Sequence, residues 1–439
     1  MKRLSGLMDR VDEGLRTLLL GGKMPAWLLG AGTFAAFFLL MMTRTLTQLA
    51  GASALARAWA VLMLCLPLGV MICFALRLTR EKSTVERLGV LALCAISMLA
   101  RVSFIERSSG DYDIYLADWI AKLAAGSFSE GMKANIGEYN VLYQYILFII
   151  TRLGVPALYA VKAVSFLGDA FLAGAVAKLA GRKNGLPAFG TALLLPTIVL
   201  NGGMFAQCDS LYAACALWGL ALALENRPAR SAVCFGLSLC FKLQSVFILP
   251  VVVVLWAARK LRVCDALIFV LTLIAVMLPA LLGGKSVGDI IGIYTAQTGL
   301  YTGLNYNAAN FFGLMETAGL DVYAYGNFAM ALAFGACALL VVWGVARAQE
   351  MDDGEFVRLA LLLVLFVVFL LPRMHERYFY LAVPLSIALA GRRGAKALIA
   401  AALIELALLS TYWALAVPLS TASLMMLTAT VLTLTVCDK

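Results

Sequence analysis

The sequence predicts an all-α polytopic membrane protein. Of its 439 residues, 63% are hydrophobic and only 14% are charged, a balance outside the range of ordinary soluble domains. Apolar runs long enough to cross a bilayer as helices recur along the chain, and short basic loops separate them. We therefore expect one membrane-embedded domain over residues 1–439, with about 12–14 transmembrane helices.

The charge and the cysteines exclude several other classes. The net charge of +10 comes from basic residues grouped in the short loops, where they indicate orientation in the membrane, so no nucleic-acid partner is expected. The ten cysteines lie mostly inside apolar segments, with no CxxC pair and no Cys/His cluster. Neither a disulfide framework nor a zinc site is indicated, and we expect no metal and no cofactor.

The N-terminal part sets the orientation. Residues 1–22 have an apolar helical face, which predicts a cytoplasmic interfacial helix, although a frayed tail fits equally well. The first spans, within 26–105, are predicted at 26–43, 58–76 and 88–105. The basic turn at 77–82 precedes the third span, and the positive-inside rule places it in the cytoplasm. The next loop therefore emerges on the extracytoplasmic side.

That loop, 106–156, is predicted to contain two helices lying at the outer interface, at about 114–123 and 142–153. Core spans follow within 157–282, at 157–180, 186–200, 210–224, 231–241 with 245–258, and 264–282. A second outer loop covers 283–325. The C-terminal spans, within 326–436, are predicted at 326–345, 358–372, 378–390, 397–413 and 420–436. This parity leaves both termini in the cytoplasm.

The unusual polar residues fall on the extracytoplasmic side of this topology, which a random scatter of structural ion pairs would not do. Arg373 and Arg377 run against the positive-inside trend and flank the only histidine, and such exceptions favour an anionic ligand. The candidate residues are Asp111, Asp113, Gln207, Asp209, Lys242, Gln244, Asn307, Asn310, Arg373, His375, Glu376 and Arg377.

These residue types suit transfer chemistry on a lipid-linked phosphate. A carboxylate can deprotonate an attacking hydroxyl, while lysine and arginine stabilise a phosphate leaving group as its negative charge grows. The sequence contains no Walker loop, dinucleotide glycine fingerprint or serine-histidine-aspartate order, so ATP-driven, redox and hydrolase functions have no support.

Structural roles stay open for the same residues. Asp111 and Asp209 could be helix N-caps, and Asp113 could simply be solvated. Lys242 could snorkel to the interface, and Arg373 and Arg377 could form salt bridges with Glu376 or with the first loop. The asparagines between 305 and 310 could be turn residues.

Four motifs together resemble a known family. They are Ser109–Trp119, Gln207–Tyr212, Phe235–Gln244 followed by Pro250, and Met374–Tyr380. In this order they are similar to motifs of the prokaryotic membrane mannosyltransferases, which are related to the second mannosyltransferase of glycosylphosphatidylinositol assembly and belong to the GT-C glycosyltransferases. Two stretches differ from the family's pattern, since Phe205-Ala206 replaces Trp-Gly and 139–143 replaces a proline-rich segment. The second difference leaves the acceptor open.

The resemblance implies a GT-C fold and an inverting transfer from a polyprenyl-phosphate sugar. By the same match, Asp111 is the catalytic aspartate, Gln207 and Asp209 line the site, and Lys242, His375 and Arg377 lie near the lipid phosphate. We expect Asp113 to assist Asp111 and Arg373 to join the phosphate-binding group. The remaining substrate-binding candidates are Gln244, Asn307, Asn310 and Glu376.

The expected function is transfer of a hexose, with mannose preferred, to an acceptor hydroxyl on a lipid-linked or glycan acceptor. The reaction would take place at the extracytoplasmic face of the cell membrane, with membrane lipids as surroundings. Two alternatives fit the same charges. One is a transporter or flippase of lipid-linked or anionic solutes, for which no internal repeat is visible. The other is a lipid-linked glycan polymerase or ligase, which would need a larger outer domain.

Overall fold

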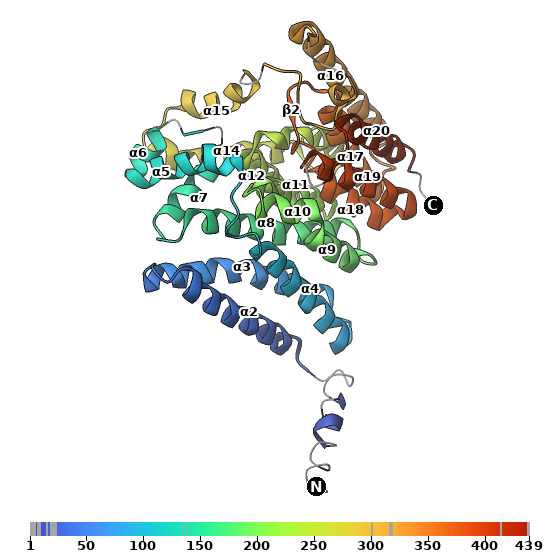
Figure 1. Ribbon diagram of the computed structural model, residues 1–439. Coiled ribbons are helices and arrows are strands. Elements are labelled where there is room, and N and C mark those ends of the chain that lie inside the picture. The colour runs from blue at the N-terminus through green and yellow to red at the C-terminus, as the bar shows by residue number, and fades with distance from the viewer. Residues whose placement is uncertain are drawn as a thin grey trace.

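The computed structural model describes residues 6, 10–14, 16, 17, 24–134, 136, 137, 139–299, 302–315, 319–412 and 415–436, without the side chains of 297–299. Most of these residues form α-helices (Figure 1). Of the predicted interfacial helix over 1–22, residues 6, 10–14, 16 and 17 are helical. The rest of that predicted helix lies outside the described residues.

Three helices form a layer that lies below the other labelled helices in Figure 1. They are α2 (Ala26–Gln48), α3 (Ala54–Leu78) and α4 (Thr84–Val102). Serine caps begin two of them, because the side chain of Ser53 accepts the amide of Ala56 and Ser83 forms a capping box with Glu86. The three predicted first spans are thereby confirmed as helices.

The 106–156 loop is helical, as predicted, but its first turn is unusual. A short π-helix, η1 (Tyr112–Leu116), runs directly into α5 (Ala117–Ala125). The loop continues with α6 (Phe128–Lys133) and α7 (Val141–Thr151), and α7 is the second of the two predicted helices. Neither the π-turn nor α6 was predicted from the sequence.

The central helices follow the predicted core spans. They are α8 (Ala157–Leu179), α9 (Gly185–Leu194), α10 (Pro196–Gly203), α11 (Asp209–Leu224), α12 (Pro228–Phe241), the 3-10 helix η2 (Leu243–Phe247), α13 (Val251–Ala257) and α14 (Val263–Leu282). The predicted span over 186–200 is broken, because α9 and α10 meet at an angle of 46°. Leu195 adopts an extended backbone there, as expected of a residue that precedes a proline.

The C-terminal third contains a feature that an all-α prediction does not include. It holds α15 (Val287–Gly299), β1 (Asn305–Tyr306), η3 (Phe311–Leu314), α16 (Val322–Arg347), α17 (Asp353–Leu370), β2 (Met374–His375), α18 (Ala382–Arg393), α19 (Ala395–Thr411) and α20 (Leu419–Leu434). Strands β1 and β2 pair in parallel, with Asn305 opposite Met374 and Tyr306 opposite His375. This pair brings the 283–325 loop next to the motif around His375.

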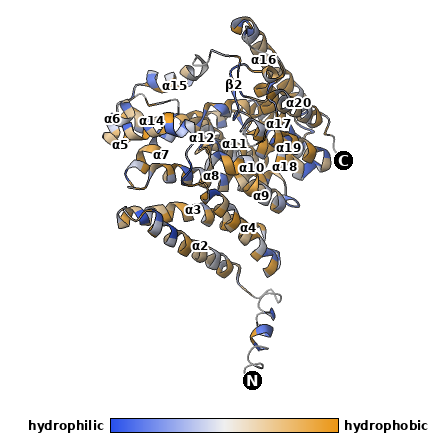
Figure 2. Ribbon diagram, viewed as in Figure 1, coloured by the Kyte–Doolittle hydropathy of each residue, from blue (hydrophilic) through white to orange (hydrophobic). Residues whose placement is uncertain are grey.

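Several helices are long and apolar enough to cross a membrane, so the chain is a multi-pass membrane protein. Among the described residues these are α2, α3, α8, α14 and α16, and α9 with α10 would make a sixth if the bent pair is one span. Within an apolar stretch of 18 residues, 83% of α8 is buried inside the protein, whereas the corresponding share for α14 is 11%. Figure 2 shows that α14 and α16 carry many apolar residues. We conclude that α8 is central and that α14 and α16 face lipid.

Two buried charged residues hold the ends of neighbouring helices. Lys162 of α8 donates from Nζ to the carbonyl oxygens of Phe104, at 2.5 Å, and of Arg107, just past the end of α4. Glu405 of α19 accepts hydrogen bonds from the amide and the hydroxyl of Thr197, at 3.0 and 2.6 Å. Because Thr197 lies in the first turn of α10, Glu405 supplies the acceptor that this helix start needs. Both contacts fix segments that precede candidate site residues, which are Asp111 in the first case and Gln207 in the second.

Candidate functional site

The carboxylate of Asp111 lies at the centre of a polar cluster built from three distant parts of the chain. Its Oδ2 accepts a hydrogen bond from Gln207 Nε2 at 3.1 Å and lies 2.7 Å from Arg377 Nη2. The side chain is still 48% exposed, whereas that of Arg377 is 18% exposed. The Asp111 carboxylate is therefore accessible from solvent, while Gln207 and Arg377 fix its orientation.

The N-cap interpretation of Asp111 is wrong. The residue precedes η1, but its side chain makes no capping hydrogen bond. Ser109 does this instead, since its hydroxyl accepts the amide of Tyr112 at 3.3 Å and donates to the carbonyl oxygen of Phe205 at 2.9 Å. Ser109 thus ties the start of the 106–156 loop to the segment before Gln207 and leaves the Asp111 carboxylate available.

Lys242 follows the last residue of α12 and points into the protein. Its ammonium group forms a salt bridge with Asp209, and the two side chains are 13% and 2% exposed. The other oxygen of Asp209 accepts from Asn201 Nδ2 at 2.9 Å. The snorkelling interpretation of Lys242 and the N-cap interpretation of Asp209 are therefore both wrong. Such a pair is retained in a protein interior only when both charges are satisfied.

Gln207 and Tyr139 connect these two charged groups. The Gln207 side chain accepts from the hydroxyl of Tyr139 at 3.1 Å while it donates to Asp111. The Tyr139 ring faces the ammonium group of Lys242, which lies 5.6 Å from the ring centroid. Since one amide is held at both ends, its oxygen and nitrogen are each directed to one partner.

The motif at 374–380 supplies the third part of the cluster. Arg377 Nε lies 2.8 Å from Glu376 Oε1, so Arg377 pairs both with Glu376 and with the first loop, as its structural interpretation predicted. The imidazole of His375 stacks on Tyr306 with centroids 4.9 Å apart and planes 16° apart. Burial lowers the pKa of His375, which favours the neutral imidazole near pH 7.

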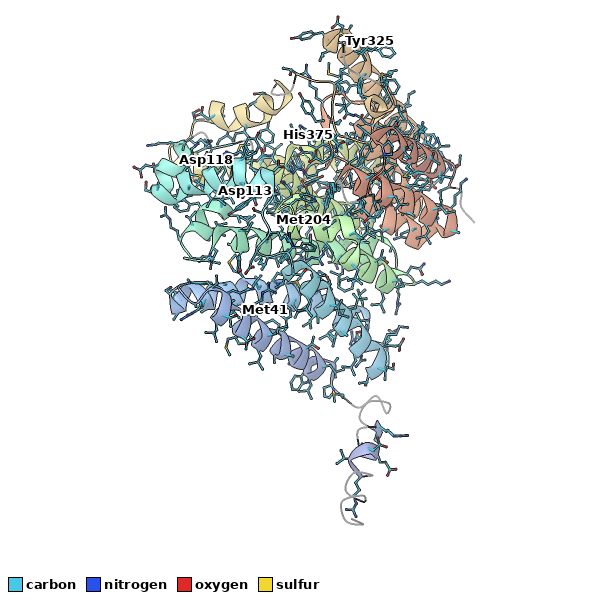
Figure 3. All side chains as sticks on the ribbon, viewed as in Figure 1. Met41, Asp113, Asp118, Met204, Tyr325 and His375 are labelled. Carbon is cyan, nitrogen blue, oxygen red and sulfur yellow. The ribbon has the colours of Figure 1, made fainter. Side chains whose placement is uncertain are left out.

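Asp113, Arg373 and Gln244 lie outside the hydrogen-bonded contacts around Asp111 described above. Asp113 is exposed and its Oδ2 accepts from the hydroxyl of Ser108 at 2.8 Å, outside the contacts described above. Figure 3 labels Asp113 and Asp118 on this segment and His375 on β2. Arg373 has a left-handed backbone, with φ of 62°, and its amide donates to the carbonyl oxygen of Leu304. Gln244 is buried, and its Oε1 has no hydrogen-bond partner among the described residues.

The asparagines act as turn residues, as their structural interpretation predicted. Asn307 has φ of 62° and donates from Nδ2 to the carbonyl oxygen of Thr411 at 2.9 Å. Asn310 is fully buried, accepts the amide of Gly313 and donates to the carbonyl oxygen of Leu371 at 3.3 Å. Their amide nitrogens are therefore used within the fold.

Three residues near the cluster have no role in the sequence-based prediction. Asn201 connects Asp209 to the hydroxyl of Tyr412, 3.2 Å away, while Tyr139 holds Gln207 and Tyr306 supports His375. A signal existed for Tyr139 alone, because the segment 139–143 differs from the family's pattern. Asn201 lies in the largely apolar helix α10 and Tyr306 lies among turn residues, and neither belongs to one of the four motifs.

The cluster combines an accessible carboxylate with an arginine and a lysine that are each neutralised by acidic partners. Such groups can take a proton from a hydroxyl and can bind an anion through charge-assisted hydrogen bonds. The comparisons with known proteins add no family: no protein-family model matches the chain, and no curated protein is significantly similar to it.

Proposed function

We propose that the protein is an inverting glycosyltransferase with a GT-C fold, about 12–14 spans and cytoplasmic termini. It transfers a hexose, with mannose preferred because of the motif resemblance, from a polyprenyl-phosphate donor to an acceptor hydroxyl at the extracytoplasmic face. One observation carries this proposal. The exposed carboxylate of Asp111 lies 2.7 Å from the guanidinium of Arg377, so a general base and an anion-binding group are adjacent.

In this mechanism Asp111 takes the proton of the acceptor hydroxyl as the hydroxyl oxygen attacks the anomeric carbon. The bond between that carbon and the phosphate oxygen breaks, and its electron pair leaves with the polyprenyl phosphate. A single displacement from the opposite face inverts the anomeric carbon. Gln207 keeps the base in position through its hydrogen bond to Asp111 Oδ2.

The cations would stabilise the leaving phosphate. Arg377 and Lys242 are paired with Asp111 and Asp209 in the structure, so the donor phosphate has to compete with carboxylates for them. When Arg377 turns to the phosphate, the Asp111 carboxylate loses this salt bridge and can accept the hydrogen bond of the acceptor hydroxyl. Neutral His375 could donate one hydrogen bond to the phosphate. Arg373, Gln244 and Glu376 complete the proposed substrate-binding group.

The test uses the purified protein in detergent with a short-chain polyprenyl-phosphate mannose. We expect release of polyprenyl phosphate by the wild type and a loss of at least about 100-fold in Asp111→Asn, the scale of a missing general base. Asp118→Asn is the matched control, because Asp118 is exposed and forms a salt bridge with Lys122 four residues along α5. Equal release by the wild type and Asp111→Asn would contradict the proposed base.

A second candidate, a transporter or flippase, is favoured by one observation. Arg101 and Asp169 form a fully buried ion pair between α4 and α8, and buried charges between spans are typical of translocation paths. Reconstituted vesicles distinguish the two functions. Movement of the labelled donor between leaflets without release of polyprenyl phosphate would support the transporter and contradict the transferase.

A further inference from the structure

A row of three aromatic side chains leads from the surface to the candidate base. Tyr115 and Trp119 have ring centroids 6.2 Å apart, and Trp119 and Tyr139 have centroids 5.5 Å apart. The hydroxyl of Tyr139 then donates to Gln207, whose amide donates to Asp111. Two hydrogen bonds therefore connect the last ring of the row to the carboxylate that is proposed to take a proton from the acceptor.

Tyr115, the first residue of this row, follows Asp111 on the same helical segment. Asp111, Tyr115 and Trp119 follow one another at intervals of four residues, and helical residues at this interval share a face. The turn from Tyr112 to Leu116 is a π-helix, a distortion that is frequent at functional sites. Tyr115 is thus the next side chain along the helix face from the candidate base.

The row is accessible at one end and rigid in the middle. Tyr115 is 53% exposed, whereas Trp119 and Tyr139 are half-buried. Trp119 packs directly against Gly137, where an added Cβ would lie 2.2 Å from the indole ring. Gly137 also has φ of +60°, so both the backbone conformation and the space favour glycine. The indole is therefore held in one place before any ligand arrives.

We propose that Tyr115 and Trp119 form the acceptor subsite, on which a sugar ring of the acceptor stacks so that one of its hydroxyls reaches Asp111. This inference rests on the proposed function and names its acceptor class, which is a glycoside. The C–H face of a pyranose packs on the negative face of an aromatic ring, and a rigid aromatic pair loses little conformational entropy on binding it. A non-sugar alcohol gains nothing from this surface.

The experiment compares two acceptors that share an alkyl chain. Octyl α-mannopyranoside offers a sugar ring, and triethylene glycol monooctyl ether offers a hydroxyl without one. Transfer from short-chain polyprenyl-phosphate mannose is measured with the wild type, Tyr115→Ala, Tyr115→Phe and Ile114→Ala. Ile114 is the matched control, since it is 67% exposed on the same helix turn but has no ring in the row.

We expect the wild type to prefer the mannoside and Tyr115→Ala to raise the KM for the mannoside by about tenfold, the loss of one aromatic contact. Tyr115→Phe, which keeps the ring, should retain the wild-type KM, and Ile114→Ala should match the wild type. Release of polyprenyl phosphate to water, measured without acceptor, should be equal in the wild type and Ile114→Ala. An unchanged KM in Tyr115→Ala, or equal use of the two acceptors, would overturn the subsite.

Other outcomes separate this inference from the proposed function. If the wild type releases no polyprenyl phosphate under any condition, the proposed glycosyltransferase function is wrong, and the acceptor subsite that rests on it is wrong as well. If the donor is cleaved but neither acceptor is used, the aromatic pair does not recruit a sugar and only the subsite is overturned. An equal rise in KM for Ile114→Ala and Tyr115→Ala would assign the row to membrane contact instead.

Discussion

Arg101 of α4 and Asp169 of α8 form a salt bridge of 2.7 Å, and neither side chain is more than 1% exposed. The same guanidinium donates to the carbonyl oxygens of Ser97 and Leu193, at 3.1 and 2.8 Å. One arginine therefore joins α4, α8 and the end of α9. Replacing Arg101 should therefore weaken the packing among all three helices.

Replacing one member of this pair should cost more than replacing both. We expect Asp169→Leu to lower the free energy of unfolding by about 3–5 kcal/mol, because a buried guanidinium is left without its counter-ion. The double variant Arg101→Leu with Asp169→Leu should lose clearly less. Chemical denaturation in detergent measures both values, and additive losses in the double variant would contradict the expectation.

Arg377 should not tolerate replacement by lysine. The guanidinium contacts Glu376 through Nε and Asp111 through Nη2, and a single ammonium group cannot reproduce this fork. We expect Arg377→Lys to lower kcat for donor cleavage by about 100-fold, the scale of one lost donor to a developing anion. Arg347→Lys, at a half-exposed position paired with Glu350, should behave like the wild type. A normal kcat in Arg377→Lys would remove Arg377 from the mechanism.

His375 should make stability depend on pH in one direction. Burial lowers its pKa in the folded protein, with Arg377 acting in the same sense and Glu376 against it. The unfolded chain therefore binds more protons, and stability is lost as the pH falls from above the unfolded pKa, about 6.5, through the folded pKa. His375→Gln should flatten this part of the curve. Melting temperatures between about pH 8 and pH 5 provide the measurement, and identical slopes would contradict it.

Ala206 should be improved by glycine. It is buried and has φ of 54°, a conformation that is strained for alanine by roughly 1 kcal/mol or more. We expect Ala206→Gly to relieve this strain and raise the free energy of unfolding. The gain should be about 1 kcal/mol or less, because the greater freedom of glycine in the unfolded chain offsets part of it. Ala213→Gly, in the buried middle of α11, is the control and should destabilise. Destabilisation by both would show that Ala206 carries no strain.

Most helices could be predicted from the sequence because apolar runs and basic turns are local signals. The segments 157–180 and 264–282, for example, correspond closely to α8 and α14. The pairing of β1 with β2 could not be predicted, since two strands of two residues have no periodicity to detect. The π-turn at Tyr112–Leu116 also leaves no compositional mark.

The sequence predicts part of the polar cluster around Asp111 but not which of its residues pair. Asp111 contacts Gln207 and Arg377 across separations of 96 and 266 residues. The predicted topology and the resemblance to known motifs group these residues, but neither predicts the contacts. Asn307 and Asn310, in contrast, could be predicted as turn residues, because the preference of asparagine for turns is a local signal. Their positions therefore need no ligand to explain them. Asn201 was missed because a buried amide that orients a carboxylate looks like any other asparagine in the sequence.

The charges of α8 bear on how the protein enters the membrane. Lys162 and Asp169 would each oppose insertion of an isolated helix by about 2.5–3.5 kcal/mol. In the folded protein Lys162 binds carbonyl oxygens that follow α4, and Asp169 binds Arg101 of α4. Both of these charges are thus paired with a segment that is synthesised before α8. The two helices should leave the translocon as a pair, and α8 synthesised without α4 should insert poorly.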